Sequence, residues 1–191
     1  MLMSVRLAAF MLGALFLIAC AEPPNKEIDQ AQGAIDAARA AGADRYAATE
    51  YVAATGALKR AQDAVTQGDY RQALNEALDS REHAQNSARE AAETRAQLRG
   101  EVERDMAQIA ALIAEANTRL AAASRRSSRR VLDTPRKELA AVNEHVQKAG
   151  AAMKADDYLA ARTELQGVKD RLQGAVKALE APAVQSSRRA R

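Results

Sequence analysis

The sequence has no tryptophan, one cysteine and few aromatic, glycine or proline residues. Aromatic side chains make up 3% of the 191 residues, with 9 glycines and 4 prolines. A single cysteine excludes an intramolecular disulfide, and scarce aromatics with a mild basic excess count against nucleic acid as a partner. The chain is instead rich in alanine, glutamate, glutamine, arginine and leucine, which favour helices. We therefore expect an all-α fold without a deep core, because alanine buries little apolar surface.

The amino terminus has the form of an export signal that stops at the lone cysteine. Residues 1–19 combine a weakly positive start with a run of apolar and small residues. The run ends at Leu17, Ile18, Ala19 and Cys20, which resembles the lipobox of bacterial lipoproteins. The resemblance implies cleavage before Cys20, a diacylglycerol on its sulfur and acylation of the new amino terminus. Two or more acyl chains are what stable membrane anchoring requires.

Two other fates of the leader remain open. Ala19-Cys20-Ala21 also fits the small-x-small rule of ordinary signal cleavage, which would release a soluble protein. A retained transmembrane anchor is disfavoured, because the apolar run from Leu7 to Ala21 is shorter than the roughly 20 residues that cross a bilayer.

The residues after the cysteine predict a short tether and a location. Residues 20–26 contain Pro23-Pro24, which favours an extended polyproline conformation. In the familiar sorting rule of enterobacterial lipoproteins, Asp after the cysteine retains the protein in the inner membrane. Because Ala21 stands there, the resemblance implies the outer membrane, facing the periplasm. No cofactor is expected beyond the lipid on Cys20.

Apolar residues recur at steps of three and four from residue 27 to residue 123, which predicts an N-terminal helical domain. The first helix is expected to stop at Gly42 and the second at Gly68, with Asp69 as the cap of the third and Gln72 completing a capping box. The expected apolar positions of the first two helices are Ile28, Ala31, Ile35, Ala38, Tyr51, Ala54, Leu58, Ala61 and Val65.

The third helix is expected to be long, because no proline follows until Pro135. Its apolar seam takes two successive steps of four between Leu98 and Met106, a stutter that locally unwinds a supercoil. Gly100 lies inside the stutter, so we expect a bend or a break there. The seam is Leu74, Ala77, Arg81, Ala84, Ala88, Ala91, Arg95, Leu98, Val102, Met106, Ile109, Ile113, Ala116, Leu120 and Ala123.

A basic linker, residues 124–134, is expected to separate this domain from a C-terminal helical hairpin, residues 135–181. Thr134-Pro135 is a typical helix start, and the fifth helix is expected from Tyr158 to its end at Pro182. Residues 182–191 are expected to be a disordered basic tail. The linker holds Arg125, Arg126, Arg129 and Arg130, a candidate site for the phosphate of a lipid or for an acidic envelope partner. The alternative is a solvated hinge at a helix end.

A short repeat recurs at an offset of 88 residues. Gly68-Asp69-Tyr70 corresponds to Asp156-Asp157-Tyr158, and in both copies an apolar helix precedes and follows it. The expected architecture is therefore an elongated antiparallel helical-hairpin bundle with a long central helix. The Gly-Asp-Tyr turn also resembles tetratricopeptide repeats, but the offset is not a multiple of 34 residues.

Residues from Cys20 to about Ala92 resemble an uncharacterised domain of proteobacterial envelope lipoproteins. The shared features are Ala38-Arg39-Ala40-Ala41-Gly42-Ala43, Tyr46-Ala47 and Gly68-Asp69-Tyr70-Arg71-Gln72-Ala73. The resemblance implies a lipidated, alanine-rich helical domain, often followed by an OmpA-like module. This chain has no room for that module, so peptidoglycan binding is not implied.

No catalytic or metal-ligating pattern is found in the sequence, so we expect a protein that is not an enzyme. His83 and His145 show no metal-ligand spacing and are expected to be solvated. Tyr70 and Tyr158 are expected to pack at hairpin turns, and Arg81 and Arg95 to extend past small alanines or to pair with carboxylates. The expected function is a non-enzymatic structural or scaffolding lipoprotein; the alternative is a helical binding module or chaperone for an envelope partner. The oligomeric state is left open.

Overall fold

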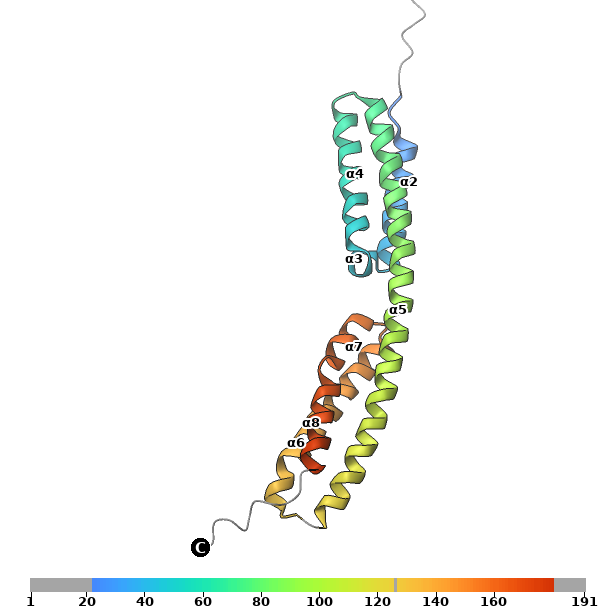
Figure 1. Cartoon of the computed structure of the whole chain (residues 1–191). Coiled ribbons are helices and arrows are strands. Elements are labelled where there is room, and N and C mark those ends of the chain that lie inside the picture. Colours follow the sequence, from blue (N-terminus) through green and yellow to red (C-terminus); the bar gives the residue numbers. More distant parts are fainter. Residues whose placement is uncertain (1–21, 126, 181–191) are drawn as a thin grey trace, which may run out of the picture. The chain divides into compact units, whose positions relative to one another are not determined.

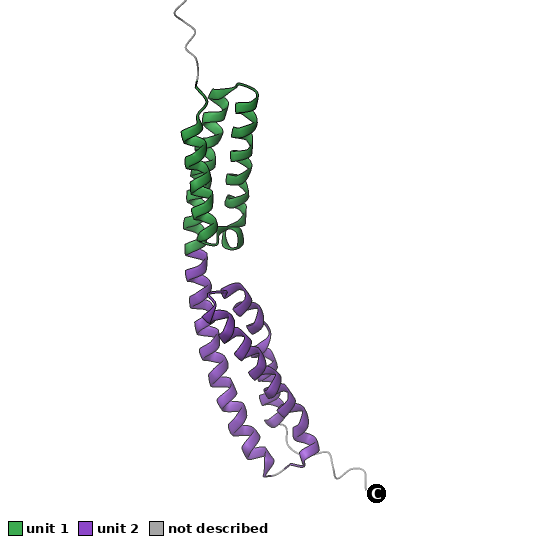
Figure 2. Cartoon of the chain, turned by 180° about the vertical axis from the view of Figure 1, so that it is seen from behind, with its two compact units in different colours: residues 1–92 green, residues 93–191 purple. Residues whose placement is uncertain are grey.

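The computed structural model describes residues 22–125 and 127–180, which are helical apart from short turns. The helices are α2 (Asn25–Ala40), α3 (Ala43–Tyr46), α4 (Ala48–Thr66), α5 (Tyr70–Ser124), α6 (Arg129–Lys154), α7 (Tyr158–Leu165) and α8 (Val168–Glu180) (Figure 1). The chain divides into two compact units, residues 1–92 and 93–191 (Figure 2). The expected all-α bundle with a long central helix is confirmed.

Unit 1 packs α2, α4 and the first part of α5 against one another, with α3 closing the α2–α4 connection. Ala31, Ile35 and Ala38 of α2 are buried, as their spacing predicts. α2 ends where predicted, because Gly42 takes a left-handed φ of 84° and donates its N–H to the Arg39 carbonyl at 2.8 Å. The same glycine lets the Tyr46 ring approach to 3.2 Å from the place where a Cβ atom would be. Other residues therefore fit this turn poorly.

Small side chains form the interface between α4 and α5 in unit 1. Ala73, Ala77 and Ala84 of α5 are completely buried, and so are Ser80 and Ser87. The Ser80 hydroxyl donates to the Ala54 carbonyl of α4 at 2.8 Å, and the Ser87 hydroxyl to the carbonyl of Ala84 in its own helix at 2.8 Å. These bonds satisfy buried groups that would otherwise destabilise the unit. Leu74, by contrast, is 36% exposed, although the sequence placed it on the seam.

Unit 2 packs the second part of α5 against α6, α7 and α8 around larger side chains. The buried core consists of Val102, Ile109, Ala116, Leu139, Val142, Ala149, Ala161, Leu165, Val168 and Leu172. It joins side chains from all four helices, so the C-terminal segment is part of a bundle with α5 rather than a separate hairpin. The tetratricopeptide resemblance extends no further than the hairpin turns.

α5 is a single helix of 55 residues, so the break expected at Gly100 is not present. Its buried positions nevertheless shift phase at the predicted stutter. Ala77, Ala84, Ala91 and Leu98 follow a seven-residue spacing, and so do Val102, Ile109, Ala116 and Ala123, with one step of four between the two series. The step of four residues is about 400° at about 100° per residue, so the buried face of α5 moves around the helix by about 40° at this point.

The linker and the helix start that the sequence predicted after α5 lie elsewhere. α6 begins at Arg129, inside the expected linker 124–134, and contains Pro135 within its second turn. Thr134-Pro135 is therefore not the helix start. Pro135 and Leu132 are buried, so apolar packing at the beginning of α6 compensates for the hydrogen bond that a proline cannot donate.

The helix expected from Tyr158 to Pro182 is also interrupted. α7 ends at Leu165 and α8 starts at Val168, because Gln166 is extended and Gly167 has a φ of 73°. The apolar step from Leu165 to Val168 continues the helical spacing across the break, which is why periodicity does not reveal it. Within the described ranges no helix is both long and apolar enough to span a membrane. The expected tail, residues 182–191, lies outside the described residues.

Candidate functional site

The predicted lipidation site lies just before the described chain. Leu17, Ile18, Ala19 and Cys20 are outside the described residues. From Pro23 onward the chain is held on unit 1: the Asn25 N–H donates to the Pro23 carbonyl at 2.8 Å, and Pro24 is buried. Pro24 has φ −78° and ψ 55°, which is not polyproline geometry. The expected tether of residues 20–26 is therefore shorter than predicted, because the fold begins within it.

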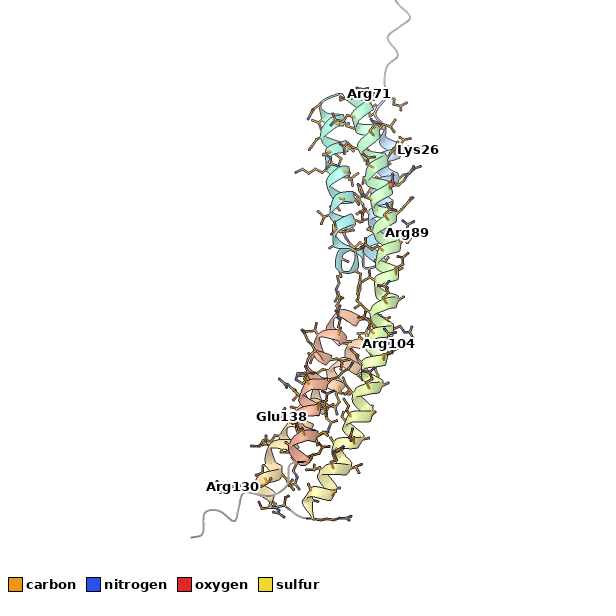
Figure 3. The ribbon with its side chains drawn as sticks, viewed as in Figure 1. Lys26, Arg71, Arg89, Arg104, Arg130 and Glu138 are labelled. Atoms are coloured by element: carbon orange, nitrogen blue, oxygen red, sulfur yellow. The ribbon has the colours of Figure 1, made fainter. Side chains whose placement is uncertain are left out.

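The end of unit 1 next to this segment presents charges of both signs and an exposed leucine. Lys26 at the start of α2 and Arg71 at the start of α5 lie at the same end of the unit (Figure 3). A hollow between the two helix starts is lined by residues 22–27 and by Leu74. Leu78, one turn further along α5, is 38% exposed.

The basic segment, the second site predicted from the sequence, joins α5 to α6. Arg125, Arg129 and Arg130 are exposed, and Figure 3 places Arg130 at the start of α6; the side chain of Arg126 lies outside the described residues. Arg129 and Arg130 occupy the first turn of α6, which contains no acidic residue, and the Ser128 side chain does not cap it. Because the N-terminal end of a helix carries partial positive charge, these two arginines are unfavourably placed there. Anion binding by the segment stays a prediction.

The repeated turns have the same hydrogen bonds in both units. In unit 1 the Asp69 N–H donates to the Ala64 carbonyl at 2.9 Å, and in unit 2 the Asp157 N–H donates to the Ala152 carbonyl at 2.9 Å. The Asp69 carboxylate accepts from the Gln72 N–H at 2.9 Å, as the predicted cap requires. The second half of the predicted capping box is not formed, because the Asp69 N–H is bonded to α4 instead.

The corresponding bonds of the second turn show that the repeat is structural. The Asp157 carboxylate accepts from the Ala160 N–H at 3.1 Å. Where unit 1 has Gly68 with φ 76°, unit 2 has Asp156 with φ 57°, a conformation that Asp adopts more readily than most residues. Each of these hydrogen bonds, and the residue with positive φ, in the turn of residues 66–73 thus has a counterpart 88 positions later.

Tyr158 is the buried aromatic residue of the second turn. Its hydroxyl donates to the Asp156 carboxylate at 2.7 Å. This hydrogen bond, with burial, raises the pKa of the Tyr158 phenol, while the positive charges of Arg99 and Arg95 oppose the rise. Arg95 therefore lies near enough to this turn for its charge to act on the phenol. Arg81, the other seam arginine, donates to the side-chain oxygen of Gln30 at 2.8 Å rather than to a carboxylate.

Both histidines bridge neighbouring helices, which the sequence did not reveal. His83 of α5 lies 2.8 Å from a carboxylate oxygen of Glu50 in α4, and His145 of α6 lies 2.9 Å from Glu164 in α7. Each pair is partly buried. Both histidines face solvent in part, as expected, and each also contacts a carboxylate of a neighbouring helix. Across the described ranges no three His, Cys, Asp or Glu residues are arranged to hold a metal ion.

Unit 2 has two hollows among its described residues. One, of about 530 Å³, lies at the α7–α8 break and is lined mainly by polar residues, including the Lys169–Asp105 ion pair with an N–O distance of 2.5 Å. The other, of about 300 Å³, lies between α6 and α8 and is lined by small residues such as Gly174 and Ala178.

Comparison with known families accounts for the first part of the chain. Residues 26–103 match the family model of DUF4398, a domain of unknown function. The DUF4398 domain includes α2, α3, α4 and the beginning of α5, and it ends next to the stutter. An uncharacterised domain in this part of the chain, expected from Cys20 to about Ala92, is thus confirmed. No curated protein and no solved structure matches the chain.

Proposed function

We propose that this protein is a lipid-anchored, non-enzymatic scaffold of the bacterial cell envelope, held in the outer membrane and facing the periplasm. The observation that carries the proposal is the position of the lone cysteine. Cys20 ends an apolar leader with a lipobox, and the DUF4398 domain begins six residues later at residue 26. The lipobox places the acyl chains on Cys20, and the short segment that follows would keep the folded domain close to the membrane.

The distribution of apolar side chains supports a scaffold over a peptide-binding groove. Over residues 22–125 and 127–180, the exposed large apolar side chains are Val52, Leu74, Leu78 and Val131. Val52 lies on α4, the two leucines on α5 and Val131 on α6. A chaperone or peptide receptor needs a continuous apolar patch, whereas closed seams and polar outer faces suit a spacer between partners.

A binding module remains the alternative, and the apolar hollow between α6 and α8 is the feature that favours it. Its volume of about 300 Å³ is at the lower end of the range for small-molecule sites, roughly 300–1,000 Å³. It is too small to enclose a helical or extended peptide segment. The scaffold is therefore the preferred function.

Anchoring is tested by metabolic labelling with palmitate and cell fractionation. We expect the wild-type protein to carry label and to sediment with outer membranes, and Cys20→Ser to lose the label and leave the membrane fraction. Ala21→Ser is the matched control, because it keeps the cysteine and should remain labelled. Unchanged membrane association of Cys20→Ser contradicts the proposal.

Scaffolding is tested by crosslinking in intact cells with a photoreactive residue at exposed positions of each unit. We expect reproducible capture of the same envelope proteins from positions on the polar faces. Absence of any reproducible partner would contradict the scaffold and the binding module alike. Capture from positions around the α6–α8 hollow alone would favour the binding module.

A further inference from the structure

The anchor-proximal end of unit 1, formed by Glu22, Lys26, Arg71, Leu74 and Leu78, has no assigned role. Its position follows from chain length. Glu22 is two positions after Cys20, and an extended chain spans at most about 3.6 Å per residue. The start of the fold therefore lies within about 7 Å of the lipid-bearing residue, if Cys20 is lipidated as proposed above.

The chain is fixed to unit 1 from this point. The Asn25 and Ile28 N–H groups donate to the carbonyls of Pro23 and Pro24 at 2.8 and 3.1 Å. Pro24 is buried, so the first residues of the fold cannot swing freely away from α2. A short, fixed connection holds this end of unit 1 close to the bilayer.

Leu74 lies at the same end. It lines one hollow with residues 22–27, although it belongs to the first turns of α5. Leu74 is 36% exposed, and Leu78, one helical turn further from the end, is 38% exposed. An exposed apolar side chain surrounded by charges of both signs, here Lys26, Arg71 and Glu22, suits the interface of zwitterionic lipids, where apolar groups meet charged headgroups.

We propose that the anchor-proximal end of unit 1 lies on the lipid headgroups of the membrane that holds the anchor, with Leu74 in contact with that layer. This inference rests on the proposed lipidation of Cys20. Unit 1 is then not free to rotate on a loose tether; the membrane covers its α2 start and its α4–α5 turn.

Because the chain contains no tryptophan, single substitutions place a unique fluorophore at chosen depths. The test uses the full lipidated chain in phosphatidylethanolamine vesicles that carry a nitroxide on a fraction of the headgroups. Leu74→Trp and Leu78→Trp report on the proposed surface. Val52→Trp is the matched control: Val52 is 65% exposed and lies 14 residues, about 21 Å along the helix, before the end of α4 at Thr66.

We expect the headgroup nitroxide to quench Leu74→Trp at least threefold more than Val52→Trp, with Leu78→Trp in between. Equal quenching of Leu74→Trp and Val52→Trp in vesicle-bound protein overturns the inference while leaving the anchor intact. Failure of the lipidated chain to float with vesicles overturns the anchor, and the inference with it. Circular dichroism checks that each variant keeps its helix content.

A second measurement needs no substitution in the fold. An amine reagent should label Lys26 several-fold less in the vesicle-bound lipidated protein than in soluble Cys20→Ser. Lys59, exposed in the middle of α4, should be labelled equally in both forms. Equal labelling of Lys26 in both forms contradicts contact with the membrane.

Discussion

Leu172→Ala tests whether unit 2 is a packed bundle around the second part of α5. The Leu172 side chain is completely buried in α8, in one core with Val102 and Ile109 of α5 and Val142 of α6. Removing three carbon atoms costs about 2.4 kcal/mol at about 0.8 kcal/mol per buried methylene. The cavity left behind raises the loss to about 3–4 kcal/mol.

The expected loss is large for a unit of this size. Domains are stable by about 5–15 kcal/mol, and 1 kcal/mol shifts the melting temperature of a domain of up to 100 residues by about 4–8 °C. Thermal melts followed by circular dichroism at 222 nm should therefore show a transition lowered by about 12–30 °C. The protein is purified in detergent for this measurement.

Leu78→Ala is the matched control, since it removes the same atoms from a side chain that is 38% exposed. Because more than a third of this side chain already faces solvent and no closed cavity is left, we expect its free energy of unfolding to fall by at most about 1.5 kcal/mol, well below the loss at Leu172. If Leu172→Ala and Leu78→Ala lower the melting temperature equally, the packing of α8 on α5 described above is wrong.

Three further predictions concern a turn, a helix end and a buried phenol. Gly68→Ala should lower the free energy of unfolding by about 1–2 kcal/mol because φ is 76° there. Gly100→Ala should raise the free energy of unfolding by about 0.5–1 kcal/mol, because no atom lies within 4 Å of the added Cβ. Urea titration measures both changes, and a lower stability of Gly100→Ala would argue against a continuous α5. Arg129→Glu should raise the free energy of unfolding by about 0.3–1 kcal/mol, because it puts a negative charge in the first turn of α6; no gain in low salt would mean that α6 starts later. Because the pKa of Tyr158 is raised in the folded protein, its contribution to stability is complete below the ordinary tyrosine pKa, near 10, and is lost as the pH rises through the folded pKa. In Asp156→Asn, ultraviolet titration should show that the Tyr158 phenol ionises at a lower pH than in the wild-type protein. An unchanged titration would exclude the hydrogen bond.

The helices of unit 1 were largely predictable because apolar spacing and glycine stops agree there. Gly42 and Gly68 end their helices as expected, and the stutter near Leu98 marks the place where α5 changes the face it buries. Ser80 and Ser87 were not predicted as core residues, because a search for apolar steps passes over a hydroxyl that is satisfied by a carbonyl. Their seven-residue separation is the signal that was available.

The errors in unit 2 have two causes. Thr134-Pro135 is a strong start signal, but burial of Leu132 and Pro135 extends α6 back to Arg129. Gly167 interrupts the last helix without interrupting its apolar spacing. At the start of α6 the burial of apolar side chains overrides a local start signal. At Gly167 the backbone conformation ends the helix although the apolar spacing continues.

The contacts of the two histidines with carboxylates could not be predicted from the sequence, for a different reason. His83 meets Glu50 and His145 meets Glu164 across helix pairs, and such contacts depend on the register of one helix against another. Neither pair has a spacing that identifies it. The basic segment, in contrast, was recognised by its composition alone. The sequence did not reveal that Arg129 and Arg130 belong to α6.

Mass spectrometry of the mature amino terminus shows whether Cys20 carries the proposed lipid anchor. Trypsin cleaves after Lys26, so protein purified from membranes should yield a peptide of residues 20–26 that carries a diacylglycerol on the Cys20 sulfur and an acyl chain on its amino group. A first peptide that starts at Glu22, or one that contains an unmodified Cys20, would contradict the account.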